Sequence, residues 1–155
     1  MGWVIRFRTV LKYFVQPVLK GEEKMKKHFA AALVALGISG IAAQSAVAGG
    51  AVDYRESVMT IYKWYLKPMK GMATGKMAFD KAAFRKNAEG LATAAQLDLL
   101  AGFPEGSMDE DSRAKEKIWK KWSDFEGKFE AFQREAAKLA QVAKEGDEAA
   151  MKQQF

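Results

Sequence analysis

The sequence contains no cysteine and only one histidine, His28. Without cysteine the chain can form neither disulfide bonds nor thiolate metal sites. It also lacks a glycine-rich phosphate loop, an H-E-x-x-H motif and a nucleophile with a histidine partner, and the acidic run 109–111 lacks the twelve-residue calcium pattern. We therefore expect a protein that is not an enzyme.

Proline is also scarce, with three residues in 155, whereas alanine, lysine, glutamate and methionine are abundant. This composition favours helix over strand. Because 49% of the residues are hydrophobic, the chain is long and apolar enough for one domain with a real core. The composition predicts a single all-α domain.

Residues 25–48 have the pattern of a bacterial signal peptide. A positively charged start, with Lys26 and Lys27, precedes an apolar run at 29–43, and Ala46-Val47-Ala48 supplies a small-x-small cleavage site. The alternative, a membrane-anchoring helix, is disfavoured because the run is short and rich in alanine and glycine. We expect export to the periplasm, a mature chain that begins near Gly49, and no stable membrane span after cleavage.

Residues 1–24 precede a signal peptide that looks complete by itself. We interpret them as an upstream extension or a mis-assigned start, with translation beginning at Met25. The extension and the signal peptide also distort the apparent charge. Of the 25 Lys and Arg residues, seven lie in 1–48, which leaves 18 basic and 17 acidic residues in 49–155. With a net charge of about +1, the remaining domain lacks the basic surface expected of a nucleic-acid binder.

Hydrophobic periodicity predicts three helices in the mature domain and the beginning of a fourth. The first should span about 53–70 and end or bend at Pro68. One stripe carries Val58, Ile61, Tyr65, Met69 and Met72, with Met59, Tyr62 and Leu66 beside it. The second should follow Asp80 as N-cap, and its small residues suit close packing against a neighbouring helix.

A long surface connection should occupy about 96–122, held in place by Trp119 and Trp122. The third helix should begin at the capping box Ser123–Glu126, and Gly146 should end it. Its apolar stripe, at spacings of four and three, is the strongest in the chain: Phe125, Phe129, Phe132, Ala136, Leu139 and Ala143. Asp147 should cap the fourth helix, of which the sequence holds only 148–155.

Several motifs occur in an order and spacing that resemble the cytochrome c prime family, including its low-spin relatives. They cover nearly all of the mature domain and continue through Phe125 to the C-terminal GDEAAMKQQF at 146–155. The others are YRESVM at 54–59, KPMKGM at 67–72, FDKAAF at 79–84, GFPEGS at 102–107 and AKEKIW at 114–119.

The resemblance implies an antiparallel four-helix bundle that holds one haem c, is exported to the periplasm, and carries electrons or binds gaseous ligands. It also implies a periplasmic redox partner and a homodimer. In that family the last helix continues about two turns beyond the position of Phe155 and carries C-x-x-C-H, whose cysteines bond the haem and whose histidine ligates the iron. That motif is absent from this sequence, so covalent attachment is not possible in the chain as given.

The resemblance also implies the cofactor contacts on the other side of the haem. Met59 matches the position of the sixth iron ligand in low-spin members, and its thioether would favour reduced iron. Arg55, one turn earlier, could pair with a haem propionate. Without the resemblance, Met59 would be assigned to the core and Arg55 to a solvated surface. The remaining predicted contacts are Glu56, Met69, Met72, Phe125 and Phe129.

Three helices and a short fourth should leave an apolar groove exposed, because a full fourth helix buries several large side chains. The sequence can then be an incomplete record, the product of a premature stop or frameshift, or a protomer whose groove is filled by a partner. The alternative function is a haem-free helical binding or structural module. Such a module would use the groove to hold a partner helix or a second copy of itself.

Overall fold

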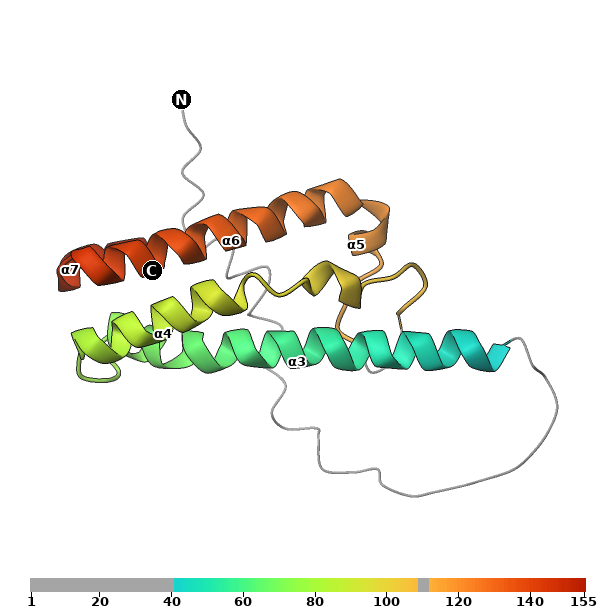
Figure 1. Cartoon of the computed structure of the whole chain (residues 1–155), viewed down its shortest axis with the longest axis horizontal. Helices are drawn as coiled ribbons and strands as arrows, with labels where there is room; N and C mark the ends of the chain where they lie inside the picture. Colours follow the sequence, from blue (N-terminus) through green and yellow to red (C-terminus); the bar gives the residue numbers. More distant parts are fainter. Residues whose placement is uncertain (1–40, 109–111) are drawn as a thin grey trace, which may run out of the picture.

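The computed structural model describes residues 41–108 and 112–155, and every regular element in these ranges is helical (Figure 1). The predicted upstream extension 1–24, and residues 25–40 of the predicted signal peptide, lie outside the described residues. The elements are α3 (Ile41–Ala73), α4 (Lys81–Ala94), the 3-10 helix η1 (Leu99–Gly102), α5 (Lys117–Lys120), α6 (Trp122–Glu145) and α7 (Glu148–Gln154).

Three long helices lie side by side and alternate in direction. Figure 1 shows α4 running back along α3, α6 running antiparallel to α4, and α7 turning back beneath the end of α6. The most extensive contacts join α4 to α6 and α3 to α4. This arrangement places the core between the three helices, with α7 closing one end.

Helix α3 is longer than the sequence predicted. It spans 33 residues, beginning at Ile41 rather than near Asp53, and it continues through Pro68 to Ala73. The prediction that Pro68 ends the helix early is therefore wrong. Proline removes the donor that would pair with the carbonyl of Trp64, but Trp64 is exposed, so water can donate to that carbonyl instead.

The buried face of α3 agrees in part with the predicted stripe, because Val58, Met69 and Met72 are buried. Tyr62 and Leu66, expected beside the stripe, are buried at its centre, whereas Ile61 is exposed and Tyr65 is half-buried. Because the pattern was broad, several helical rotations fitted it equally well. Contact with α4 and η1 selects the face that carries Tyr62.

At the helix ends, some of the predicted capping signals are confirmed and one is not. The side chains of Asp80 and Asp147 accept hydrogen bonds from the backbone N–H groups of Ala83 (3.0 Å) and Ala150 (2.9 Å), which confirms both predicted N-caps. Gly146 ends α6 as predicted. The predicted capping box at Ser123 is wrong, because α6 already begins at Trp122, directly after α5.

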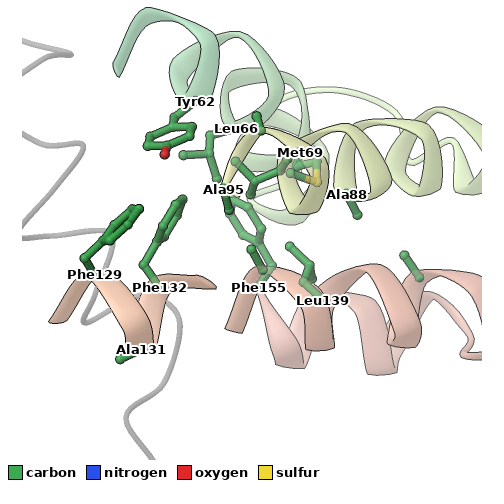
Figure 2. Close-up of a cluster of buried hydrophobic side chains, with 14 of the residues drawn as sticks. Tyr62, Leu66, Met69, Ala88, Ala95, Phe129, Ala131, Phe132, Leu139 and Phe155 are labelled. Atoms are coloured by element: carbon green, nitrogen blue, oxygen red, sulfur yellow. The ribbon is translucent and has the colours of Figure 1, made fainter. Parts of the chain in front are cut away.

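The core is closed at its C-terminal end by α7. Met151 and Phe155 are buried, the Phe155 ring lies 6.0 Å from the Phe84 ring, and Figure 2 shows Phe155 between Met69 and Leu139. No large apolar side chain of α6 or α7 is exposed. Within the described ranges the exposed ones are Tyr54, Ile61, Trp64, Met77, Leu97 and Met108.

The predicted open groove is therefore not found among the residues that the structure describes. In the same ranges, 41–108 and 112–155, no helix is both long enough and apolar enough to cross a membrane.

Candidate functional site

Arg55 is buried, with 3% of its surface exposed, and it joins α3 to the connection that follows α4. Its Nη1 donates to the carbonyl oxygen of Gly102 and to Oγ of Ser107, both at 2.9 Å. Its Nη2 donates to the carbonyl oxygen of Ser107 at 2.7 Å and to Oγ of Ser112 at 2.5 Å. The interpretation of Arg55 as a solvated surface residue is therefore wrong.

Aromatic rings complete the surroundings of this guanidinium. Its central carbon lies 5.0 Å from the centre of the Phe103 ring and 6.0 Å from that of Trp119, within the range of cation–π attraction. The Trp119 indole N–H donates to the carbonyl oxygens of Phe103 (3.1 Å) and Pro104 (3.0 Å). This confirms the prediction that Trp119 holds the long connection in place.

Gly102 allows α3 and the connection to approach this closely. A Cβ atom at Gly102 would lie 2.8 Å from Cβ of Arg55 and 3.0 Å from the Tyr54 ring. Sequence reasoning recognised Gly102 as part of a family motif but did not assign it, or Ser107, as partners of Arg55. Ser107 is 1% exposed, and a buried serine needs a polar partner. Its role as a partner of Arg55 therefore follows from its burial, which the sequence does not show.

Met59 lies one turn after Arg55, half-buried against the core. The next turn of α3 carries Tyr62, which is fully buried and whose ring lies 5.0 Å from the Phe132 ring. Figure 2 shows its oxygen on the side that faces Phe129 and Phe132 of α6. We call Tyr62, Phe129 and Phe132 the Tyr62 cluster.

The Tyr62 hydroxyl has no hydrogen-bond partner in the structure, although it is fully buried. Burial raises the pKa of Tyr62 far above its ordinary value, and proximity to Tyr54 adds to the increase. The phenol is therefore protonated, so it has a proton to donate and nothing to receive it. The sequence placed Tyr62 beside the apolar stripe of its helix and gave no signal for this unpaired group.

The predicted contacts on α6 lie at the same end of the bundle as Arg55 and Met59. Phe125 is half-buried and its ring lies 4.8 Å from that of Phe103, the ring that also stacks against Arg55. Phe129 is buried, with its ring 6.5 Å from that of Phe132. The Phe103 ring thus links Arg55 to Phe125, whereas Phe129 packs with Phe132 one turn further along α6.

Met69 and Met72 are buried nearer the other end of α3, about 15 and 20 Å along the helix axis from Met59 at 1.5 Å per residue. The Met72 sulfur accepts a hydrogen bond from the backbone N–H of Asp80 at 3.4 Å, and Met69 lies near Phe155 (Figure 2). The structure therefore places both methionines around the turn between α3 and α4 and the end of α7, away from Met59.

Glu56 is exposed and points away from the Tyr62 cluster. It lines an open depression of about 470 Å³ on the outer face of α3, together with Asp53, Ser57, Thr60 and Ile61. Within residues 41–108 and 112–155, no group of three or more His, Cys, Asp and Glu side chains is arranged to hold a metal ion. The roles predicted for the seven cofactor contacts stay predictions.

Comparison with known proteins gives a consistent result. The sequence model of the family described as Cytochrome C' matches residues 50–155. A cytochrome c' from Halomonas halodenitrificans is 36% identical over 103 residues, covering 63% of this chain and 77% of that protein. A cytochrome c' from Alcaligenes xylosoxydans is 33% identical over 97 residues, covering 63% and 74%.

Solved structures agree with the sequence comparisons. Cytochrome c prime from Shewanella frigidimarina aligns with a TM-score of 0.66 and 35% identity, over 70% of this chain and 84% of that one. A nitric oxide complex of a variant from Alcaligenes xylosoxidans aligns at 0.59 and 30% identity, over 68% and 80%. These neighbours and the described helices confirm the predicted all-α, antiparallel four-helix-bundle fold class.

Proposed function

Because the chain belongs to the cytochrome c prime family, we propose that it is a haem-binding protein of the periplasm that carries electrons or binds small gaseous ligands. Haem supplies an iron that changes oxidation state and accepts such ligands. The side chains of this chain would bind and orient the group and exclude water from it. A carrier or ligand-binding role agrees with the absence of catalytic motifs from the sequence.

The observation that carries the proposal is the interior around Tyr62. Its walls are apolar, formed by Phe129 and Phe132 with Met59 on the neighbouring turn of α3. A buried hydroxyl without a partner lies in the same place. Haem fits this combination, because its apolar macrocycle can lie against these walls and oxygen atoms of its carboxylates, or of a ligand on its iron, can accept the hydrogen bond of the hydroxyl.

Two side chains of α3 would hold the group from one side. The Met59 thioether is a soft iron ligand that stabilises the reduced state. The Arg55 guanidinium can hydrogen-bond a carboxylate through two N–H groups, in which case it would exchange part of its bonds to Ser107 and Ser112. The walls would come from Phe125 and Phe129.

None of the 155 residues given is a cysteine, so they supply no thiol for the thioether bonds of haem c. The contacts that we propose for Arg55, Met59 and Phe129 are noncovalent. The sequence pattern of 25–48 supports a periplasmic location. The near-neutral charge of 49–155 argues against a nucleic-acid partner, and we propose a periplasmic redox protein and a second copy of the chain as partners.

Two structures support the gas-binding part of the proposal. Cytochrome c prime variants from Alcaligenes xylosoxidans, at 30% identity to this chain, have been solved as nitrosyl and nitric oxide complexes. We expect the reduced, haem-loaded form of this chain to bind nitric oxide. The choice between electron transfer and gas binding then depends on whether Met59 keeps its place on the iron.

The test is a titration of the purified chain with hemin. We expect a saturable shift of the Soret band at one hemin per chain, and no haem on the polypeptide after denaturing electrophoresis. Met59→Ala should remove the methionine–iron charge-transfer band, whereas Met77→Ala, a change at an exposed methionine, should keep it. A Soret spectrum identical to that of free hemin at every ratio would contradict haem binding.

A further inference from the structure

Other polar side chains of the fold have hydrogen-bond partners, which makes the Tyr62 hydroxyl unusual. The Tyr54 hydroxyl donates to the carbonyl oxygen of Asp98 at 2.8 Å, and the Gln133 amide donates to that of Ala95 at 2.8 Å. Arg55 and Ser107 satisfy each other. Only the Tyr62 oxygen is fully buried without a partner among the buried side-chain polar atoms that the structure describes.

An unpaired hydroxyl in an apolar interior is costly, and phenylalanine would fill nearly the same volume without that cost. The oxygen is held toward α6 by the packing of its own ring, which lies 5.0 Å from the Phe132 ring. The neighbouring side chains of the Tyr62 cluster carry no polar atoms. Among the residues that the structure describes, the Tyr62 hydroxyl is thus a buried hydrogen-bond donor held beside two apolar rings.

We propose that the Tyr62 hydroxyl is a recognition group of the interior site, which donates its hydrogen bond to an oxygen acceptor that enters with haem. The inference rests on the proposed function and adds a residue that neither the sequence pattern nor the comparisons assign to the site. An acceptor of this kind has two sources, a haem carboxylate or a small oxygen-bearing ligand on the iron. Both would relieve the cost that the hydroxyl imposes on the haem-free protein.

The proposal predicts opposite effects of Tyr62→Phe on the empty and the loaded protein. Without haem, the variant should melt at the same temperature as the parent or higher, because a costly group is gone. With hemin, its dissociation constant should rise roughly fivefold to thirtyfold, the range expected for one buried hydrogen bond. A side chain with a merely structural role would change both quantities in the same unfavourable direction.

Tyr65→Phe is the matched control. Tyr65 lies one turn further along α3 and is half-buried against Gly90. Its substitution by phenylalanine removes a hydroxyl of the same kind. Neither its melting temperature nor its hemin affinity should move beyond experimental error. If Tyr65→Phe weakens hemin binding as much as Tyr62→Phe does, the recognition role of Tyr62 is wrong.

Two further probes identify the source of the acceptor. Hemin dimethyl ester lacks free carboxylates, so a carboxylate acceptor predicts that parent and Tyr62→Phe bind this probe equally well. An acceptor on the iron predicts that the affinity difference persists. It also predicts that the C–O stretching frequency of the carbon monoxide complex rises in Tyr62→Phe, because a hydrogen bond to the ligand has been lost.

The remaining outcomes separate this inference from the proposed function. If the parent binds hemin and Tyr62→Phe binds it equally tightly, the recognition role is wrong and haem binding stands. If the parent does not bind hemin at all, both are wrong. A Tyr62→Phe variant that melts at a lower temperature and also binds weakly would reassign Tyr62 to packing.

Discussion

At the scale of single residues, the surroundings of Arg55 are not those that its local sequence pattern predicted. Arg55 lies one turn of α3 before Met59. The family resemblance predicts that it pairs with a haem propionate, and the sequence pattern alone predicts that it faces solvent. In the structure it is buried, and its N–H groups donate to two carbonyl oxygens and two hydroxyls of Gly102, Ser107 and Ser112. In the structure, Arg55 therefore organises the loop that borders the candidate site.

Replacement of Arg55 by alanine should lower the free energy of unfolding by about 2–4 kcal/mol, because it leaves several buried acceptors without donors. Urea denaturation followed by tryptophan fluorescence would measure the loss. Arg85→Ala is the control, since Arg85 is exposed and pairs with Glu89 on its own helix, and it should change stability by less than about 0.5 kcal/mol. Equal effects of the two substitutions would refute the organising role.

The pKa of Tyr62 predicts a dependence of stability on alkaline pH. Burial raises this pKa above its ordinary value, so above about pH 10 the unfolded chain loses the phenol proton while the folded chain keeps it. The free energy of unfolding should therefore fall as the pH rises from about 10 toward the folded pKa. Tyr62→Phe should lose this part of the pH dependence, and Tyr65→Phe should retain it, when urea midpoints are compared at pH 9 to 11.

At the scale of helices, the contact between α3 and α4 depends on a glycine within α4. A Cβ atom at Gly90 would lie 2.3 Å from the Tyr65 ring, so the two helices approach at a point where no side chain fits. The small residues of the second helix were predicted to allow such an approach. The structure identifies Gly90 as a position of α4 that packs directly against the Tyr65 ring of α3.

Gly90→Ala should therefore destabilise the protein by about 1–3 kcal/mol through overpacking, despite the higher helix propensity of alanine. Gly127→Ala supplies the comparison, because Gly127 lies inside α6 with no atom within 4 Å of its would-be Cβ. That substitution should stabilise the protein by about 0.5–1 kcal/mol. Thermal melts that show stabilisation by both changes would disprove the close contact.

Much of the helical organisation could be predicted from the sequence because its signals are local. Asp80 and Asp147 cap helices through bonds to residues three positions away, and the stripe of α6 depends only on spacing. The buried face of α3 was not predictable from the local pattern, because its contacts with other elements such as α4 and η1 decide which side is buried. The partners of Arg55 lie 47 to 57 residues away, and no local pattern specifies such distant contacts.

At the scale of the whole molecule, α7 determines how the core ends. Its seven residues follow a tight corner at Gly146 and fold back along α6, where the Gln154 amide donates to the Glu135 carboxylate at 2.8 Å. Met151 and Phe155 are thereby buried near Phe84. This short segment thus packs against the end of the core.

Phe155→Ala should lower the free energy of unfolding by about 2–4 kcal/mol, since it removes a buried ring from the end of the core. Trp64→Ala is the matched change of an aromatic residue that is 76% exposed, and we expect an effect below about 0.5 kcal/mol. Chemical denaturation of the two variants and the parent would measure their free energies of unfolding. A Phe155→Ala variant as stable as Trp64→Ala would mean that α7 does not close the core.

The long-range bonds of Arg55 also bear on the order in which the protein folds. They close segments of 47 to 57 residues, and the entropy of closing such segments must be lost before the bonds form. Once α3 has docked on α4, the two ends are already close and little further entropy is lost. The loop around Ser107 should thus join the native structure late and leave it early, so its amide hydrogens should exchange with solvent before those of α4 and α6.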